Sequence, residues 1–437
     1  MACSTESVQD EETNPQLPQP TPEVTDTTKN DSTSSGKDVV IPVVTKTPGA
    51  IALSENERKL LYQCNLFALR LLRNVNSETN GSSFIISPMS VGYLLGMLND
   101  GAKGKTQDEL MQALGFGNSS AKSVNEYFGN MLVNAPTVDE KVDIASANAL
   151  FANSSQGVAF AKPFAADMTG YYQAGIESLD FTQANTLDKI NGWCNSSTKG
   201  LIPTILNNDE FNPNGMAYLL NSVYFKADWT TVFDKEETKQ QDFTTADGQT
   251  VGMDMMHKQD DVLYWEDEVM KAVSLPYGKG AFRMVCMLPE NGNTVSSLID
   301  RLCEGLWQEY VKPETQLMTG VDILLPKFTT ETSQNLVPIL EKMGIATAFT
   351  TAADYGSMLE SGNIYFDLMK QKARIEVSEE GTEAAAATIT GQVTIGEGDT
   401  DQEPQFPTFH ATRPFVYIIM EANTGAIFFV GEFTGKD

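Results

Sequence analysis

Histidine is scarce in this chain. The 437 residues include only two, His257 and His410, which leaves little material for histidine-based acid–base catalysis or metal binding. Neither stands in a motif with a serine or cysteine nucleophile, so we expect no enzymatic activity. Basic residues are also few, since 30 lysines and arginines face 58 aspartates and glutamates, for a net charge of −28. Such an excess repels phosphate backbones and anionic lipid, which argues against nucleic-acid binding and polybasic membrane docking.

Cysteine gives no support for a metal site or a disulfide framework. The five cysteines are Cys3, Cys64, Cys194, Cys286 and Cys303. No pair has the close spacing of a zinc or redox site, and Cys286 lies in an apolar run where a buried thiol is expected. No apolar stretch approaches the roughly 20 residues of a membrane-spanning helix. We therefore predict no metal, no cofactor and no spanning helix.

Residues 1–53 differ in composition from the rest. They are rich in proline, threonine, serine and acidic residues, and they cannot bury enough apolar surface to offset their ordering entropy. We predict a flexible acidic tether over 1–53 and a folded domain over 54–437. The Ala2-Cys3 pair fits the remnant of a lipoprotein signal, in which Cys3 would be lipidated. A chance cysteine is the alternative. The first interpretation places the protein outside the cytoplasm, secreted or lipid-anchored at a bacterial cell surface.

Helical and strand patterns without internal repeats follow the tether. A capping box over residues 54–57 opens one amphipathic helix, and Ser87-Pro88 opens a second that ends near Gly101. Strand-like runs lie at 219–225, 282–288 and 321–325, and a hairpin at 415–430 closes the chain. Because helices come early and hairpins late, we expect an α+β fold instead of a doubly wound sheet.

The most informative stretch is 376–414. Between residues 382 and 395 it has no proline and one charge, Glu383. A segment that slides between paired strands needs an N–H at every position and small side chains, because proline removes a donor and bulk blocks passage. In alternation, Ala384 and Ala386 lie on the face that would be buried and Glu383 lies on the other. From the residues alone, a short alanine-rich helix is the alternative.

This stretch resembles the hinge of the serpin family, and further motifs follow in serpin order over about residues 54–433. They are 84–90 (FIISPMS) with 101–109, 190–202, 221–229 (NSVYFKADW), 325–328 (LPKF), 340–345 (LEKMGI), 353–354 (AD) and 413–415 (RPF). The resemblance implies one large domain of helices packed on three β-sheets, with an exposed reactive-centre loop at about 380–412.

The resemblance also implies a function. Inhibitory serpins are suicide substrates: a target serine protease forms an acyl-enzyme with the loop, and the cleaved loop then inserts as a new central strand. We expect a monomer that forms this covalent complex. A non-inhibitory carrier, chaperone or binding protein is the alternative, but such members are expected to show bulky or charged residues or proline in the hinge. This hinge lacks them.

Functional residues carry over by position in the family motifs. The hinge is Glu379, Glu380, Gly381, Thr382, Glu383, Ala384, Ala385, Ala386, Ala387 and Thr388. The shutter beneath the sheet would hold Ser87, Ser90 and Asn191, with Gln371 at a position often filled by histidine. Trp229 would lie at the breach, where insertion starts.

The scissile bond is harder to place. Its usual distance from the hinge puts it between Ile395 and Gly396, with Val393 and Thr394 as neighbouring candidates. Pro414 lies 19 residues beyond Ile395, which is longer than the family usually has, so cleavage within 399–403 is the alternative.

Charge along the chain narrows the expected partners. No lysine or arginine lies between Arg374 and Arg413, which argues against a trypsin-like target. We expect an elastase-like or subtilisin-like serine protease, and papain-like cysteine proteases stay open because they also form acyl-enzymes. The region after Gly115 offers little basic charge beyond Lys122, so we expect no heparin-type polysaccharide partner.

Overall fold

The computed structural model describes residues 49–312, 315–360, 362–382 and 406–436, which belong to one unit over residues 46–437. Its α-helices are α1 (Glu55–Asn76), α2 (Pro88–Gly101), α3 (Gly104–Leu114), α4 (Ala121–Asn134), α5 (Lys162–Tyr172), α6 (Thr186–Ser197), α7 (Val295–Arg301), α8 (Trp307–Tyr310) and α9 (Val337–Lys342). The two predicted helix starts are confirmed. Ser54 and Glu57 form a reciprocal capping box at α1, and the Ser87 side chain caps α2 with Pro88 in its first turn.

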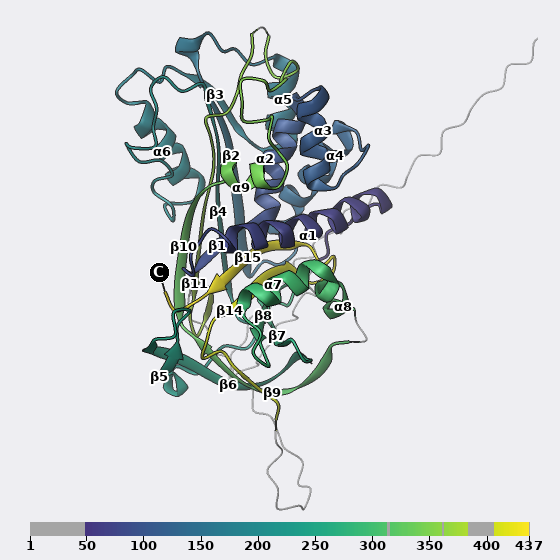
Figure 1. Ribbon diagram of the computed structural model, residues 1–437, viewed down its shortest axis with the longest axis vertical. Coiled ribbons are helices and arrows are strands. Elements are labelled where there is room, and N and C mark those ends of the chain that lie inside the picture. Colours follow the sequence, from purple (N-terminus) through teal and green to yellow (C-terminus); the bar gives the residue numbers. More distant parts are fainter. Residues whose placement is uncertain (1–48, 313–314, 361, 383–405, 437) are drawn as a thin grey trace, which may run out of the picture. The chain divides into compact units, whose positions relative to one another are not determined.

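One sheet has six strands among the described residues, in the order β10-β11-β12-β4-β2-β3. Figure 1 labels all of them except β12. They are β10 (Phe328–Asn335), β11 (Leu368–Val377), β12 (Gly381–Thr382), β4 (Ala217–Asp228), β2 (Val142–Asn153) and β3 (Gly175–Leu179). β11 and β4 pair directly and in parallel from Leu368–Tyr218 to Arg374–Tyr224. Beyond Arg374 they diverge, and β12 lies between them, antiparallel to both. This arrangement leaves an entry for a further strand.

The second sheet has nine described strands and is continuous through β6 (Thr250–Glu266). The others are β1 (Phe84–Ile86), β15 (Ile427–Phe433), β14 (Phe415–Glu421), β8 (Phe282–Pro289), β7 (Met270–Tyr277), β9 (Leu317–Pro326), β13 (Thr408–His410) and β5 (Lys239–Thr244). β6 pairs with β7 at one end and with β5 at the other. By hydrogen bonding, the described residues therefore form two sheets where three were expected, because the 17-residue β6 joins two of them.

The predicted strands and hairpin are confirmed, as is the α+β class. The runs at 219–225, 282–288 and 321–325 lie in β4, β8 and β9, and β14 and β15 form the closing hairpin. α2 is buried almost all round because it contacts both sheets, through β4 and β15. On the opposite face of the six-stranded sheet, α6 packs Ile190 and Cys194 against Tyr218 and Leu220.

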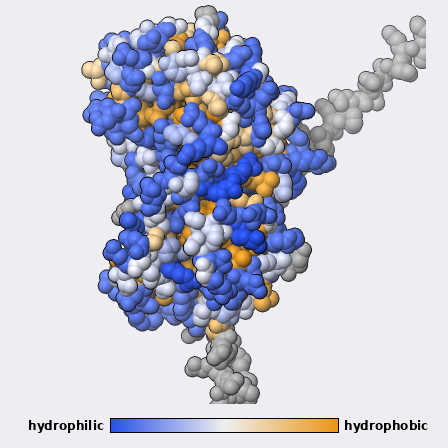
Figure 2. Space-filling model, viewed as in Figure 1, coloured by the Kyte–Doolittle hydropathy of each residue, from blue (hydrophilic) through white to orange (hydrophobic). Residues whose placement is uncertain are grey.

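The surface is mostly polar on the face shown in Figure 2, with smaller apolar areas between polar residues. Large apolar side chains that are exposed in the described part of the chain are Tyr62, Val133, Val311, Leu317, Met318 and Phe406. No described helix is both long and apolar enough to cross a bilayer. Within the same residues, no group of three or more His, Cys, Asp and Glu side chains is arranged to hold a metal ion.

Candidate functional site

The start of the predicted hinge lies inside the six-stranded sheet. Gly381 is opposite Asp228, and Thr382 is opposite both Ala227 and Val377. Thr382 is fully buried, and its hydroxyl is 2.7 Å from the Tyr277 hydroxyl. A Cβ atom on Gly381 would stand 2.2 Å from the Ala227 carbonyl oxygen, and the Gly381 φ is +150°. Glycine is required here because β4 passes so close to its backbone.

Trp229, the predicted breach residue, lies beside the turn that leads into β12. Its indole Nε1 donates to the Ser378 carbonyl at 2.9 Å, and its backbone N–H donates to the Glu380 carbonyl at 2.8 Å. The ring stacks on Tyr277 with centroids 4.3 Å apart and planes at 12°. Trp229 therefore holds the chain just before β12 and also contacts the residue that binds Thr382.

Two hinge carboxylates fix the same turn. Glu379 is buried, and its carboxylate accepts from Lys327 and from the Thr238 hydroxyl, each at 2.9 Å. Burial raises the pKa of Glu379, but the hydrogen bonds from Lys327 and Thr238 outweigh it and hold the pKa below its usual range. Glu380 forms an ion pair with Lys235, and the hydrogen bond that the Lys235 ammonium donates lowers the pKa of Glu380. The turn at 378–380 is thus anchored by charge as well as by backbone hydrogen bonds.

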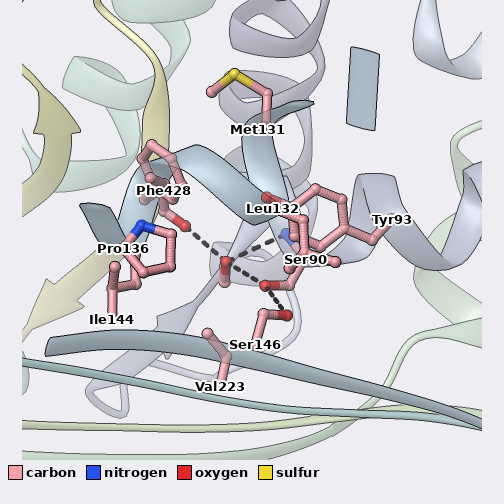
Figure 3. Close-up of a pocket in the computed structure, with 11 residues that line it drawn as sticks. Ser90, Tyr93, Met131, Leu132, Pro136, Ile144, Ser146, Val223 and Phe428 are labelled. Atoms are coloured by element: carbon pink, nitrogen blue, oxygen red, sulfur yellow. Dashed lines mark hydrogen bonds between the residues drawn. The ribbon is translucent and has the colours of Figure 1, made fainter. Parts of the chain in front are cut away.

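A buried polar cluster lies beneath the middle of the sheet, at the start of α2 (Figure 3). The Ser87 hydroxyl donates to the Phe428 carbonyl at 2.7 Å and lies 3.0 Å from the Ser90 hydroxyl, which in turn lies 3.0 Å from that of Ser146. A cavity of about 20 Å³ adjoins these hydroxyls, which is enough space for a single water. Ser87 and Ser90 are therefore brought together as predicted.

Gln371 joins this cluster to the two central strands. Its side chain accepts from the Ser87 N–H at 2.7 Å and donates to the Ser87 carbonyl at 3.1 Å. The same amide nitrogen donates to Asn221 Oδ1 at 3.0 Å. Asn221 in turn donates to the Ser146 hydroxyl and to Asn148 Oδ1, both at 2.9 Å. The cluster therefore spans β11 and β4 at the seam between them.

The predicted place of Asn191 in this cluster is wrong. Asn191 lies on α6, where its amide oxygen accepts from the Ile205 N–H at 2.9 Å and its amide nitrogen donates to the Leu206 carbonyl at 2.9 Å. It fixes the segment after α6. The amide in the cluster belongs to Asn221, a fully buried polar residue in the middle of apolar β4. That polar position within the 221–229 motif was the available signal.

Several predicted residues lie outside the described part of the chain. They are Cys3, the hinge residues Glu383, Ala384, Ala385, Ala386, Ala387 and Thr388, and the scissile-bond candidates Val393, Thr394, Ile395 and Gly396. Both histidines are described. His257 on β6 and His410 on β13 contact the same carboxylate, Asp322, at 2.7 and 3.2 Å. His410 is a strand residue, as expected.

Comparison with known proteins gives one consistent match. The family model described as "Serpin (serine protease inhibitor)" matches residues 62–435. Serpin B6 of Bos taurus is 32% identical over 374 residues, which cover 84% of this chain and 97% of that protein. Iripin-2 of Ixodes ricinus is 31% identical and covers 87% of this chain and 94% of its own length.

Solved structures agree. The native state of Tengpin, a thermophilic serpin, superimposes with a TM-score of 0.77 at 28% identity, over 88% of this chain and 95% of that one. Thyroxine-binding globulin in complex with thyroxine gives 0.76 at 25% identity, over 86% and 99%.

Proposed function

Since this chain belongs to the serpin family, we propose that it inhibits proteases as a suicide substrate, by inserting its cleaved loop between β4 and β11. Serpins as a family are protease inhibitors and not enzymes, although the fold also serves a thyroxine-binding protein. The fold alone therefore does not separate inhibitor from carrier. The small, proline-free hinge sequence favours the inhibitor.

The observation that carries the proposal is β12. Thr382 already pairs with both neighbours, and Gly381 with β4, in the antiparallel sense that an inserted strand would need. Continued in the same register, the strand would put Thr388 between Gln371 and Asn221, and residue 392 opposite Ala217, where β4 begins. Ile395 would then lie three residues beyond residue 392, just past the first residue of β4. Cleavage after Ile395 therefore matches the length of the available strand.

The energetics favour insertion once the loop is cut. The parallel pairing of β11 with β4 would be lost, but the new strand forms two antiparallel ladders in its place. At roughly 0.5–1.5 kcal/mol net for each hydrogen bond, a gain on the order of 10 kcal/mol follows. The 14 residues from Thr382 to Ile395 span about 46 Å at ~3.3 Å each, so a protease attached at Ile395 would be carried that far. Such a displacement is large enough to distort the acyl-enzyme.

The loop composition sets the target class. A trypsin-like pocket needs lysine or arginine, and none lies between Arg374 and Arg413. We therefore propose an elastase-like or subtilisin-like serine protease as the target, and papain-like cysteine proteases as a second class.

The test is incubation with elastase, subtilisin, chymotrypsin and papain, with trypsin as the negative control. We expect an SDS-resistant complex at close to one inhibitor per protease, and a higher Tm for the cleaved inhibitor. Terminal sequencing of the released peptide should place the bond after Ile395. Clean cleavage with no complex and no gain in Tm would show that the protein is not an inhibitor.

A further inference from the structure

Lys258 on β6 is a buried lysine next to the hinge, with an exposed side-chain fraction of 8%. Its ammonium donates to the Thr231 carbonyl at 2.7 Å and to Asp260 Oδ2 at 3.0 Å. The same group lies 4.6 Å from the centroid of the Phe233 ring, a cation–π contact. One cation thus contacts the backbone and a side chain of the turn at 229–233.

That turn carries the hydrogen bonds that hold the hinge. Trp229 donates to the Ser378 and Glu380 carbonyls, and the Phe233 N–H donates to the Glu379 carbonyl at 2.9 Å. From one side β7 holds the turn, because the Thr230 N–H donates to the Pro276 carbonyl at 2.8 Å and Trp229 forms a β-bridge with Tyr277. From the other side Lys258 holds it.

A buried ammonium is a costly way to fill this space. Burial lowers the pKa of Lys258, which shows that its surroundings disfavour the charge even though Asp260 opposes the shift. An apolar side chain of similar length would avoid that desolvation cost. The ammonium makes directional contacts that an apolar group cannot make. It fixes the Thr231 carbonyl and the Phe233 ring relative to β6 at the same time.

We propose that Lys258 is a positioning residue for loop insertion: by fixing the 229–233 turn, it holds the template on which the strand after Thr382 adds to the sheet. The inference rests on the proposed inhibitory function and deepens it. The pairs that follow Thr382 would be the first to form, so an accurately placed hinge speeds the start of insertion.

The consequence appears in the fate of the acyl-enzyme. In that intermediate the protease serine oxygen is esterified to the loop carbonyl carbon, and the new amino terminus has left with a proton. Insertion traps the ester. Hydrolysis consumes one water, returns the serine hydroxyl and leaves a cleaved inhibitor with a free carboxylate. Slower insertion therefore raises the number of inhibitors consumed for each protease trapped.

The test measures that stoichiometry of inhibition with subtilisin for the wild type and Lys258→Met, which keeps the stem and removes the charge. We expect an increase of about fivefold, from the loss of one cation–π contact and a charged hydrogen bond. The bimolecular rate constant corrected for stoichiometry should not change, because the attacked bond is remote from Lys258. Lys258→Arg keeps a cation that can donate to Thr231 and face Phe233, so it should restore the wild-type value.

The matched control is Lys271→Met on β7, which removes a charge paired with Glu266 at 3.7 Å. Its stoichiometry should equal that of the wild type. Phe233→Leu removes the ring but keeps the backbone donor to Glu379, and it should raise the stoichiometry in the same direction even if Lys258→Met does not fold.

The outcomes are distinguishable. A wild type that traps none of the proteases tested overturns the inhibitory function and this inference with it. An active wild type whose Lys258→Met and Phe233→Leu variants show unchanged stoichiometry overturns only the role of Lys258, even if their Tm is lower. If Lys271→Met raised the stoichiometry of inhibition by the same amount, the effect would be one of charge alone. That result would also overturn the role of Lys258.

Discussion

The side-chain nitrogen of Gln371 donates a 3.0 Å hydrogen bond to the side-chain oxygen of Asn221, across the seam between β11 and β4. The two residues are directly opposite in the parallel pairing, and both are buried. A strand inserted between β11 and β4 must break this hydrogen bond. It is therefore part of the barrier that keeps the sheet closed below Thr382 until the loop is cut.

Gln371→Leu tests how much that hydrogen bond contributes to the stability of the uncleaved protein. The substitution leaves the Ser87 N–H and Asn221 Oδ1 without their Gln371 partner, and an unsatisfied buried group costs about 1–3 kcal/mol. We expect a lower Tm for the uncleaved protein. The cleaved form should lose less, because the inserted strand has already separated Gln371 from Asn221. The measurement is thermal unfolding of both variants before and after loop cleavage.

Gln112→Leu is the control, since Gln112 lies exposed on α3. Its effect should stay within about 0.5 kcal/mol, as for most surface substitutions. An equal Tm loss in the cleaved and uncleaved forms of Gln371→Leu would show that the contact is ordinary core packing and no part of the barrier.

The features that the sequence predicts best are those that depend only on residues close together in the chain. The capping box at Ser54, the cap at Ser87 and the apolar strand runs depend on neighbours in the chain, and the structure bears them out. Trp229 and Gln371 could be placed because each stands at a fixed position in a family motif. Asn191 was carried over in the same way, from the 190–202 motif, and it failed because a place in a motif does not say which face of α6 the side chain occupies.

Contacts between segments far apart in the chain could not be predicted from the sequence. The partners of Glu379, which are Lys327 and Thr238, lie 52 and 141 residues away. Lys327 stands in the 325–328 motif, but nothing in the local pattern of either residue indicates a contact with Glu379. Lys258 is similar, because its burial results from the packing of the 229–233 turn on β6. The joining of two expected sheets through β6 also depends on strand partners and not on the strand's own residues.

Gly381→Ala tests whether the early insertion of β12 matters for trapping. The added methyl group would meet the Ala227 carbonyl oxygen at 2.2 Å and the Asp228 Cα at 2.5 Å, so β12 must move out of the sheet. We expect the variant to behave mainly as a substrate, with a stoichiometry of inhibition raised on the order of tenfold, as 1–3 kcal/mol of strain implies. Titration against subtilisin measures it.

Gly170→Ala in α5 is the matched control, because a Cβ there would meet no atom within 4 Å. It should leave the stoichiometry unchanged and, as an alanine in a helix, should not lower the Tm. Wild-type stoichiometry in Gly381→Ala would show that partial insertion of the hinge is not needed for trapping.

Glu432 on β15 gives the fold a specific dependence on pH. Its carboxyl is buried, and burial raises its pKa to about 7 despite the hydrogen bond from Asn76. Because the folded pKa lies above the unfolded value of 4.5, the carboxyl's contribution to stability is fully present below pH 4.5 and is lost as pH rises to about 7. The loss is about 3 kcal/mol at 1.36 kcal/mol for each pH unit.

Glu432→Gln keeps the shape and the partner of the carboxyl without its ionisation. Relative to the wild type, the variant should therefore gain stability by that amount between pH 4.5 and pH 8. Denaturant unfolding at the two pH values measures the difference between the two proteins, which cancels the titration of every other group they share. A constant difference across this range would mean that the pKa of Glu432 is the same in the folded and the unfolded protein, so that burial does not raise it.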